Sequence, residues 1–332
     1  MYREQRCTAM PSDARLLLLD KDEVQSLLLP DDVLAAVREA FVLHSDGEGR
    51  VFPVVREPLA TGGVFGIKSG DVQAQGLLGF KAAGFWPNNR QLGGEPHQAT
   101  IILIDPATGR PVCIMDGNAV TTMRTGAAGG LGLQQLARPD STRLCLFGTG
   151  VQARVQLSFA LRLLPSLGEV RYATVDGKRD AAFEAQFAHR CDISPARDRN
   201  AAVSESDIVI TATPGAGALF DTQAVRPGTH LNCVGADTKG KRELPEGLLQ
   251  RVRLFVDDQV QARQIGETQW APDTPCIELG DLLTGKARVD RQPADITVFD
   301  MTGLALQDLT VARLLHQRAG ATGVGSSIPW SW

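Results

Sequence analysis

The sequence predicts an α/β protein in which a Rossmann-type, doubly wound parallel sheet follows an α+β N-terminal domain. From residue 141 onward, continuous apolar runs alternate with helical patterns, as in sheets whose strands are buried on both faces. The first of these runs, RLCLF, leads directly into a glycine-rich turn. Residues 51–116 instead contain short strand-like runs separated by glycines, which is typical of an antiparallel sheet.

The N-terminal part is expected to begin with two helices, over residues 20–28 and 30–47. In the second helix, apolar residues recur at helical spacing up to Gly47. An antiparallel meander over 51–116 follows, and its last two strands are joined by the turn-rich segment PATGRP. Next comes a helix over 119–137, whose glycines lower its helix propensity but allow close packing.

The second half alternates regularly between strands and helices. Strands are expected over 143–148, 169–175, 207–214, 230–237, 253–258 and 296–303. Helices are expected over 151–164, 179–190, 243–252 and 304–320. This order predicts two domains: residues 14–125 together with a C-terminal helix over 304–332, and residues 126–303. Residues 1–13 are expected to form a loose tail.

Composition excludes several classes of function. A chain of 332 residues with a net charge of −4 and no Lys/Arg run offers no basic surface for nucleic acid. No apolar run approaches the roughly 20 residues of a membrane span, and the polar N-terminus lacks the core of a signal peptide. The six cysteines show neither CxxC spacing nor zinc-ligand spacing, so we expect no metal site and a reducing, cytoplasmic setting.

The turn after RLCLF has the form GxGxxA, the alanine variant of the dinucleotide fingerprint. Gly148 permits a tight turn, Gly150 has no Cβ to block a pyrophosphate, and Ala153 lets the helix pack against the strand. Val151 and Gln152 open that helix, whose free N–H groups would receive the phosphates. The sequence therefore predicts a nicotinamide dinucleotide site.

The choice between NAD and NADP depends on the segment after the second strand of this unit. Asp176 favours NAD, because an acidic residue there binds the ribose 2′-hydroxyl. Thr174, Lys178 and Arg179 would tolerate a 2′-phosphate. We expect NAD(H), with NADP(H) left open.

Ligands of doubly wound sheets bind beyond the carboxyl ends of the strands. Those ends place Thr211, Thr213, Gly235 and Asp237 beside the expected cofactor. Asp237 follows an apolar strand and a glycine, so its carboxylate is a candidate acid or base. The alternative is an aspartate that only caps the next turn.

Several motifs resemble the ornithine cyclodeaminase/μ-crystallin family. They are FK at 80–81 with WPNN at 86–89, HQAT at 97–100, DGN at 116–118, TTMRT at 121–125, GTGVQA at 148–153, GADTKGKREL at 235–244 and LALQDL at 304–309. They occur in order from about residue 20 to 320 and are specific in combination. The segments FPVVRE, GIKSG, GFWPNN and DTKGK look closest to the iminosuccinate reductases of that family.

The resemblance implies an active site between an N-terminal domain, which also forms a dimer, and the Rossmann domain. It implies that Lys81 and Arg124 bind the substrate carboxylate, with Arg56 beside them, and that Asp237 handles the substrate nitrogen. Asp237 and Lys81 are thus the predicted catalytic residues. Thr125, in the same motif as Arg124, is expected at the cofactor. The chemistry of the residues agrees, since arginine grips a carboxylate through paired N–H groups and lysine adds a point charge.

Two further residues bear on the substrate. His97 is expected near the substrate, either as a structural hydrogen-bonding group or as a proton relay. Lys68 would repel the side-chain amine of ornithine and attract a second carboxylate, unless it is a surface lysine. The leading hypothesis is therefore an NAD(P)H-dependent imine reductase that converts iminosuccinate to L-aspartate. The alternatives are ornithine cyclodeamination to proline, a ketimine reductase or alanine dehydrogenase, and a non-catalytic, crystallin-like binding protein.

Overall fold

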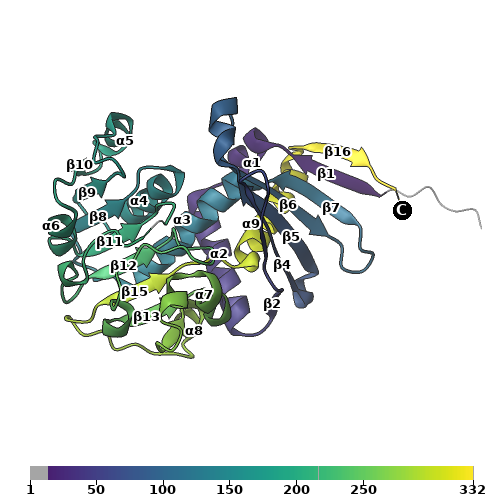
Figure 1. Cartoon of the computed structure of the whole chain (residues 1–332). Coiled ribbons are helices and arrows are strands. Elements are labelled where there is room, and N and C mark those ends of the chain that lie inside the picture. The colour runs from purple at the N-terminus through teal and green to yellow at the C-terminus, as the bar shows by residue number, and fades with distance from the viewer. Residues whose placement is uncertain (1–13, 216, 332) are drawn as a thin grey trace, which may run out of the picture.

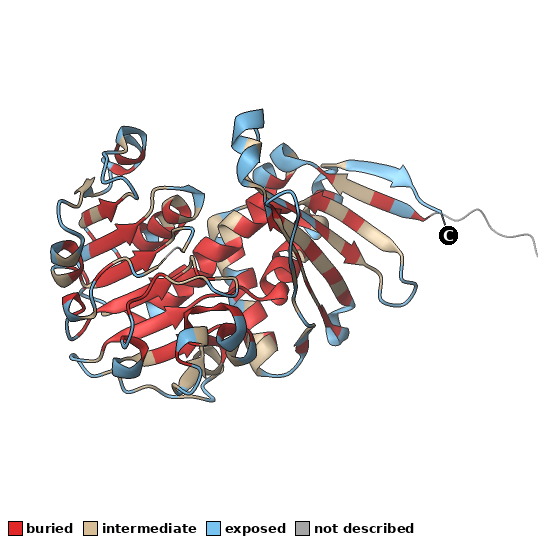
Figure 2. Ribbon diagram, in the orientation of Figure 1, coloured by how far each residue is buried: buried red, intermediate tan, exposed pale blue. Residues whose placement is uncertain are grey.

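The computed structural model describes residues 14–215 and 217–331, so the predicted N-terminal tail lies outside the described residues. Two sheets of eight strands flank a central layer of helices (Figure 1). This layer consists of α2 (Pro30–Ser45), α3 (Gly117–Leu136) and α9 (Ala305–Thr322). A single buried cluster joins these helices to residues of both sheets, and the interior of the molecule is therefore continuous across the layers (Figure 2).

The N-terminal sheet contains the predicted meander, because the strands from β4 to β7 pair antiparallel in chain order. Two strands outside the predicted range complete it: β1 pairs parallel with β7, and β16 pairs antiparallel with β1. The strand order is β16 (Ser326–Pro329), β1 (Arg15–Leu19), β7 (Pro111–Asp116), β6 (His97–Ile104), β5 (Leu77–Phe85), β4 (Val64–Val72) and β2 (Gly49–Val51), and β3 (Val55–Pro58) pairs with β4.

The second sheet is parallel in all its described pairs, which confirms the predicted Rossmann-type architecture. Its strand order is β10 (Asp192–Pro195), β9 (Glu169–Ala173), β8 (Arg143–Phe147), β11 (Ile208–Thr211), β12 (His230–Cys233), β15 (Thr297–Asp300), β13 (Arg253–Val256) and β14 (Cys276–Glu278). The edge strands β10 and β14 were not predicted, since each is short and only partly apolar. The shorter helices are α1 (Lys21–Leu27), α4 (Val151–Leu163), α5 (Ala181–Phe187), α6 (Arg199–Ser204), α7 (Gln259–Ile265) and α8 (Leu279–Thr284).

One predicted helix is wrong. Over residues 243–252 the structure has only a single 3₁₀ turn, Leu249–Arg251. Gly247 adopts a φ of +78°, which a regular helix does not accommodate, and Pro245 lacks the N–H that an interior helical residue donates. The segment instead runs past the ends of β11 and β12, where Glu243 is fully buried.

The helix α3 connects the two halves of the molecule. Asp116 caps its start by accepting hydrogen bonds from the N–H groups of Asn118 and Ala119. The predicted domain boundary after residue 125 falls inside this continuous helix. Glycines along it allow close packing, as expected: a Cβ on Gly126 would lie 2.5 Å from Val155 on α4.

The helix expected over 304–320 is observed as α9, which ends at Thr322, but the rest of the segment to 332, which the domain assignment counted as helix, is not helical in its described residues. Gly323 caps α9 with a φ of +71°, a left-handed conformation that glycine adopts at little cost. The chain then turns and returns as β16 alongside β1 (Figure 1). Both α9 and β16 therefore pack with the N-terminal sheet, although about half of the chain separates them from its other elements.

The two faces of the N-terminal sheet differ in exposure. Helices α1, α3 and α9 pack against one face, where Lys81 and Ile101 are buried side by side. On the opposite face Phe80, Ile102 and Ile114 lie in one row across β5, β6 and β7, and all three are only partly buried. The second face is thus apolar and still accessible in the isolated chain.

Candidate active site

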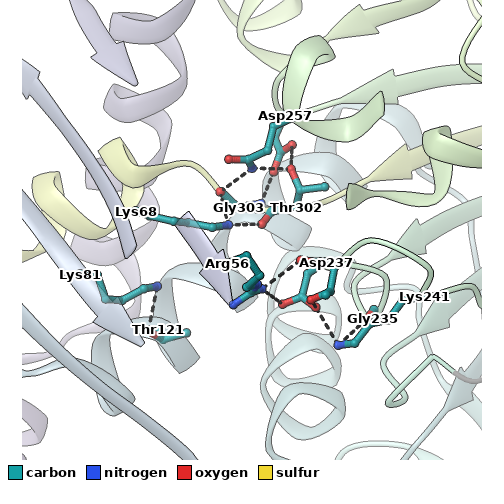
Figure 3. A network of polar contacts seen from close by, with 12 residues as sticks. Arg56, Lys68, Lys81, Thr121, Gly235, Asp237, Lys241, Asp257, Thr302 and Gly303 are labelled. Carbon is teal, nitrogen blue, oxygen red and sulfur yellow. Dashed lines mark hydrogen bonds and ion pairs between the residues drawn. The ribbon is translucent and has the colours of Figure 1, made fainter. Parts of the chain in front are cut away.

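Six residues predicted to contact substrate line one cavity between the N-terminal sheet and the carboxyl ends of the Rossmann strands. Strands β3 to β6 provide Arg56, Lys68, Lys81 and His97, α3 provides Arg124, and the loop after β12 provides Asp237. Figure 3 shows several of these side chains approaching one another from the two sheets. The structure thus brings together residues that are up to 181 positions apart, as for Arg56 and Asp237.

A buried carboxylate links the two cations predicted to hold the substrate carboxylate. Asp308, in the first turn of α9, lies 2.8 and 2.7 Å from Nζ of Lys81 through its two oxygens, and its Oδ1 lies 3.1 Å from Nε of Arg124. Nη1 of Arg124 donates to Gln307, and Nζ of Lys81 donates to the hydroxyl of Thr121. No role was predicted for Asp308, although the residue is part of the LALQDL motif.

The charge of Lys81 depends on its buried neighbours and changes near neutral pH. Burial and the neighbouring Arg124 lower the pKa of Lys81 to about 7, although Asp308 acts in the opposite direction. Burial opposes ionisation of Asp308, but Arg124 and Lys81 outweigh it and hold the pKa of that carboxyl below its usual value. The carboxylate therefore stays ionised, while the lysine can exchange its proton near neutral pH.

Lys68 is buried and is not a surface lysine. Its Nζ donates to the carbonyl oxygens of Thr302 and Gly303 at 2.5 and 2.7 Å (Figure 3). Asp257 holds that loop in turn, accepting hydrogen bonds from the Thr302 hydroxyl and the Gly303 N–H. Burial and the charges of Arg124 and Arg56 lower the pKa of Lys68 to about 8.

Asp237 faces the cavity and is held by two cations. Arg56 donates to its carboxylate at 3.0 Å and to its backbone carbonyl at 2.9 Å, and Lys241 donates to Oδ1 at 2.7 Å. Burial opposes ionisation, but Lys241 and Arg56 outweigh it and place the pKa of Asp237 well below its usual range. At neutral pH Asp237 is therefore a carboxylate, which accepts hydrogen bonds and offers a negative charge to the cavity. The Arg56 contact also joins the N-terminal sheet to the Rossmann strands.

The orientation of His97 follows from its neighbour. Asn118 donates through Nδ2 to Glu95 and to the His97 carbonyl, so its Oδ1 accepts a hydrogen bond from Nδ1 of His97 at 3.0 Å. Burial and the charge of Lys81 lower the pKa of His97, which favours the neutral ring. Its Nε2 is then a hydrogen-bond acceptor and adds no positive charge to the cavity.

The glycine turn has the geometry that a dinucleotide needs. Gly148 has a φ of +101°, and a Cβ there would lie 2.6 Å from the carbonyl oxygen of Ala212. A Cβ on Gly150 would meet nothing within 4 Å, so this residue borders open space at the start of α4. No described side chain caps that helix, and the buried Oε1 of Gln152 has no donor among the described residues. The free N–H groups of the first turn, which begins at the exposed Val151, suit a pyrophosphate.

The other predicted cofactor residues surround this turn. Ala153 is fully buried beneath it, and Thr125 lies on α3, where its carbonyl accepts a hydrogen bond from Gln156 of α4. Thr211 ends β11 in the interior. The role of these residues toward the cofactor stays a prediction.

A second residue without a predicted role, Glu243, fixes the ends of β11 and β12. One of its oxygens accepts from the N–H and hydroxyl of Thr213, and the other accepts from the N–H of Gly235. A Cβ on Gly235 would lie 2.3 Å from the Thr213 carbonyl and 2.5 Å from the Glu243 carboxyl group. The predicted residues Thr213 and Gly235 are thus held together by a carboxylate from the GADTKGKREL motif.

The segment expected to read the 2′ position of the cofactor lies in the loop after β9. Asp176 accepts a hydrogen bond from the N–H of Lys178 and forms a 3.2 Å ion pair with its side chain. Arg199, for which the sequence predicted no role, donates to the carbonyls of Thr174 and Val175 in the same loop. The loop therefore combines a carboxylate, which suits the ribose hydroxyls of NAD, with nearby cations, which would suit the 2′-phosphate of NADP.

A histidine and two carboxylates also meet at the boundary between the layers, away from the cavity. Nε2 of His44 lies 3.1 Å from Asp258 and 3.6 Å from Glu278. Burial opposes protonation of His44, but the hydrogen bond to Asp258 and the charge of Glu278 raise its pKa. The group behaves as an ion pair between α2 and the Rossmann layer. Sequence alone gave no signal for it, because its members are far apart in the chain.

Within the described residues, the helices are too short or too polar for any of them to cross a lipid bilayer.

Comparison with known proteins finds relatives of one family along nearly the whole chain. The sequence model of the ornithine cyclodeaminase/mu-crystallin family matches residues 15–323. Alanine dehydrogenase of Archaeoglobus fulgidus is 34% identical over 322 residues, covering 94% of this chain and 98% of that protein. Iminosuccinate reductase of Paracoccus denitrificans is 32% identical over 330 residues, covering 94% and 99%.

Solved structures agree with the sequence comparison. A dimeric archaeal alanine dehydrogenase with bound NAD superposes with a TM-score of 0.89 at 32% identity, covering 96% of this chain and all of that one. The iminosuccinate reductase of Paracoccus denitrificans with NAD+ gives 0.87 at 30% identity, with 96% and 100% covered. The chain was expected to be most similar to iminosuccinate reductases, but among these relatives its likeness to the alanine dehydrogenases is slightly greater.

Proposed function

The chain belongs to the ornithine cyclodeaminase/mu-crystallin family, and on that premise we propose that it is an NAD(H)-dependent imine reductase that converts iminosuccinate to L-aspartate. The general activity follows from its relatives: it is an NAD-dependent oxidoreductase that acts at an amine or imine carbon. The substrate is the proposed part. We propose that Asp176 is the residue that binds the ribose hydroxyls of NAD, because an acidic residue after the second strand of such a unit commonly does so.

The observation that supports a dicarboxylic substrate is the excess of cations in the cavity. Arg56, Lys68, Lys81 and Arg124 line it, while Asp237 is the carboxylate among its described lining residues. A monocarboxylic imino acid needs one pair of cations, here Lys81 and Arg124. Lys68 keeps one of its three donors after its hydrogen bonds to the Thr302 and Gly303 carbonyls, and it can offer that donor to a second carboxylate. Its charge would repel the side-chain ammonium of ornithine.

These residues perform binding and orientation. Lys81 and Arg124 would hold the carboxylate beside the imine and so fix the reacting carbon, a major source of rate. Asp237 would stabilise the positive charge of the protonated imine nitrogen, since Asp237 stays ionised. His97 offers Nε2 as a second acceptor for an N–H of the substrate. NADH, when bound at the glycine turn, supplies the hydride.

The test is the Lys68→Met variant, assayed by NADH absorbance with freshly generated iminosuccinate. We expect the wild type to oxidise NADH rapidly and the variant to show a KM raised about 10- to 100-fold, because a charge-assisted contact is worth roughly 1.5–3 kcal/mol. Lys286→Met serves as the control, since Lys286 pairs with Asp46 on the surface. An unchanged KM in Lys68→Met would remove the case for a second carboxylate.

Two other substrates separate the remaining functions. Pyruvate with ammonia tests alanine dehydrogenase activity, which the 34% identity to that enzyme favours as the second candidate. L-Ornithine with NAD tests cyclodeamination, which would release proline and ammonia without net NADH. Faster turnover of either substrate than of iminosuccinate would replace the proposed one.

A homodimer is also proposed, formed through the accessible apolar face of the N-terminal sheet. Phe80, Ile102 and Ile114 cross that face in register, and such a surface is typical of an association site. The structure of the archaeal alanine dehydrogenase is described as a dimer, which supports the proposal.

Ile102→Asp is expected to convert the protein to a monomer in sedimentation velocity, because it places a charge in the middle of this face. Leu92→Asp is the control: Leu92 is 84% exposed on the 3₁₀ turn Pro87–Leu92, outside the sheet. A variant at Ile102 that sediments as the wild type does would exclude this face as the interface.

A further inference from the structure

We propose that Asp308 is a positioning residue that sets both the spacing and the charge of the carboxylate-binding pair Lys81 and Arg124. This inference rests on the proposed function, because it assigns Asp308 its role through the substrate carboxylate. Asp308 itself lies behind the pair and does not line the cavity. Its effect on the substrate would therefore be transmitted through the two cations.

The geometry carries the first half of the proposal. The Asp308 side chain is 1% exposed, and one of its oxygens, Oδ1, contacts both Lys81 at 2.8 Å and Arg124 at 3.1 Å. A shared acceptor holds the ammonium and the guanidinium next to each other, as a single substrate carboxylate requires. The anchor is rigid, because it belongs to the buried start of α9.

Independent contacts hold the two cations from other directions. Gln307 accepts from Nη1 of Arg124, and Thr121 accepts from Nζ of Lys81. Among the described residues, none accepts a hydrogen bond from Nη2 of Arg124, so this donor is free for a ligand. Asp308 thus holds the two cations together, while Nη2 of Arg124, a residue that lines the cavity, keeps its donors.

The second part of the proposal, that Asp308 sets the charge of Lys81, rests on the charged groups around that lysine. Lys81 is surrounded by Arg124 from α3, Lys68 from β4, His97 from β6 and Asp308 from α9. Of these, Asp308 is the group that favours the charged lysine, and the cations disfavour it. Without the Asp308 charge, the pKa of Lys81 would fall below its value of about 7, and the lysine would change from about half protonated to mostly neutral at pH 7. A neutral amine has little attraction for a substrate carboxylate.

The experiment compares the pH dependence of succinate binding in the wild type and in Asp308→Asn, by calorimetry on the full chain. Succinate is the probe because it carries two carboxylates and undergoes no reaction. Wild-type affinity should fall as pH rises through the Lys81 pKa of about 7. In Asp308→Asn the same fall should occur at least about one pH unit lower, because an adjacent opposite charge shifts a pKa by ~1–3 units. The two proteins should converge as the pH is lowered.

Control variants isolate the effect. Asp207→Asn removes a carboxylate that pairs with Arg138 outside the site, and it should leave the profile unmoved. Lys81→Arg should abolish the fall near pH 7, because a guanidinium keeps its proton, and should leave only a fall near the Lys68 pKa of about 8. Adding Asp308→Asn to Lys81→Arg should then shift nothing near pH 7. A purely structural role for Asp308 would weaken binding equally at every pH.

Every result of these measurements either supports or overturns the proposed role of Asp308. A folded Asp308→Asn protein with the wild-type profile overturns the proposal. A fall near pH 7 that persists in Lys81→Arg overturns it too, because the fall would then not come from Lys81. This second result decides the matter if Asp308→Asn does not fold. A shifted profile supports it. If no imine is reduced but the succinate profile shifts, the proposed reaction fails while the role of Asp308 stands. If iminosuccinate is reduced but the profile does not shift, the reverse holds.

Discussion

Replacing Arg124 by methionine should lower kcat/KM for the imino acid by about 10²- to 10³-fold, which corresponds to ~3–4 kcal/mol. Two effects add in the same direction. The variant removes the donor Nη2, which has no acceptor among the described residues, and it leaves Asp308 buried with Lys81 as its remaining cation. Steady-state kinetics with iminosuccinate and NADH measure the loss. The dissociation constant of NADH should stay within about twofold of the wild type, because Arg124 is not among the predicted cofactor residues.

Arg124→Lys separates charge from geometry at the same position. Lysine keeps the positive charge but cannot present paired N–H groups in one plane, so kcat/KM should lie between those of the wild type and of the methionine variant. Recovery of the full wild-type value by lysine would mean that Arg124 acts only as a point charge. Equal activity in all three proteins would exclude Arg124 from the site.

Two neighbouring glycines should respond differently to the same substitution. Gly148→Ala should lower both stability and NADH affinity, because its φ of +101° is unfavourable for alanine and the new Cβ would approach the Ala212 carbonyl at 2.6 Å. A strained backbone of this kind costs ~1–3 kcal/mol. Gly150→Ala should leave stability unchanged, because its Cβ would meet nothing within 4 Å. It should still weaken NADH binding about tenfold or more, since the methyl group would point toward the expected pyrophosphate.

Urea unfolding and NADH fluorescence titration test this pair on the same preparations. A Gly150→Ala protein that binds NADH as the wild type does would place the pyrophosphate elsewhere. If Gly150→Ala were destabilised as strongly as Gly148→Ala, the open space at the start of α4 would be in doubt. The comparison distinguishes a turn that only shapes the fold from one that also receives a ligand.

The sequence predicted the parts of the fold that depend on local patterns. The strand at 143–147 and the helix at 151–163 follow from an apolar run, a glycine turn and helical periodicity. The antiparallel meander follows from glycine-bounded apolar runs. The 243–252 segment was misjudged because its apolar spacing suggested a helix, whereas Gly247 and the buried Glu243 serve the ends of two distant strands.

For the site, the residues that face the cavity were easier to anticipate than those behind them. Lys81, Arg124 and Asp237 stand in motifs with recognisable chemistry. Asp308 and Glu243 stand in motifs too, but their partners lie 227 and 30 positions away, as for Lys81 and Thr213. Periodicity and spacing describe neighbours along the chain, so they do not reveal which distant cation or N–H group a buried carboxylate will meet.

The return of α9 to the N-terminal sheet has a consequence for synthesis on the ribosome. The strands that carry Lys81 and the helix that carries Arg124 leave the exit tunnel before the whole Rossmann unit, yet their counter-ion Asp308 is translated after it. The interior Rossmann strand β15 ends at Asp300, so the dinucleotide-binding unit is itself complete only shortly before α9 emerges. The substrate pocket has to wait for α9, and until then two cations destined for the interior lack the carboxylate that compensates them.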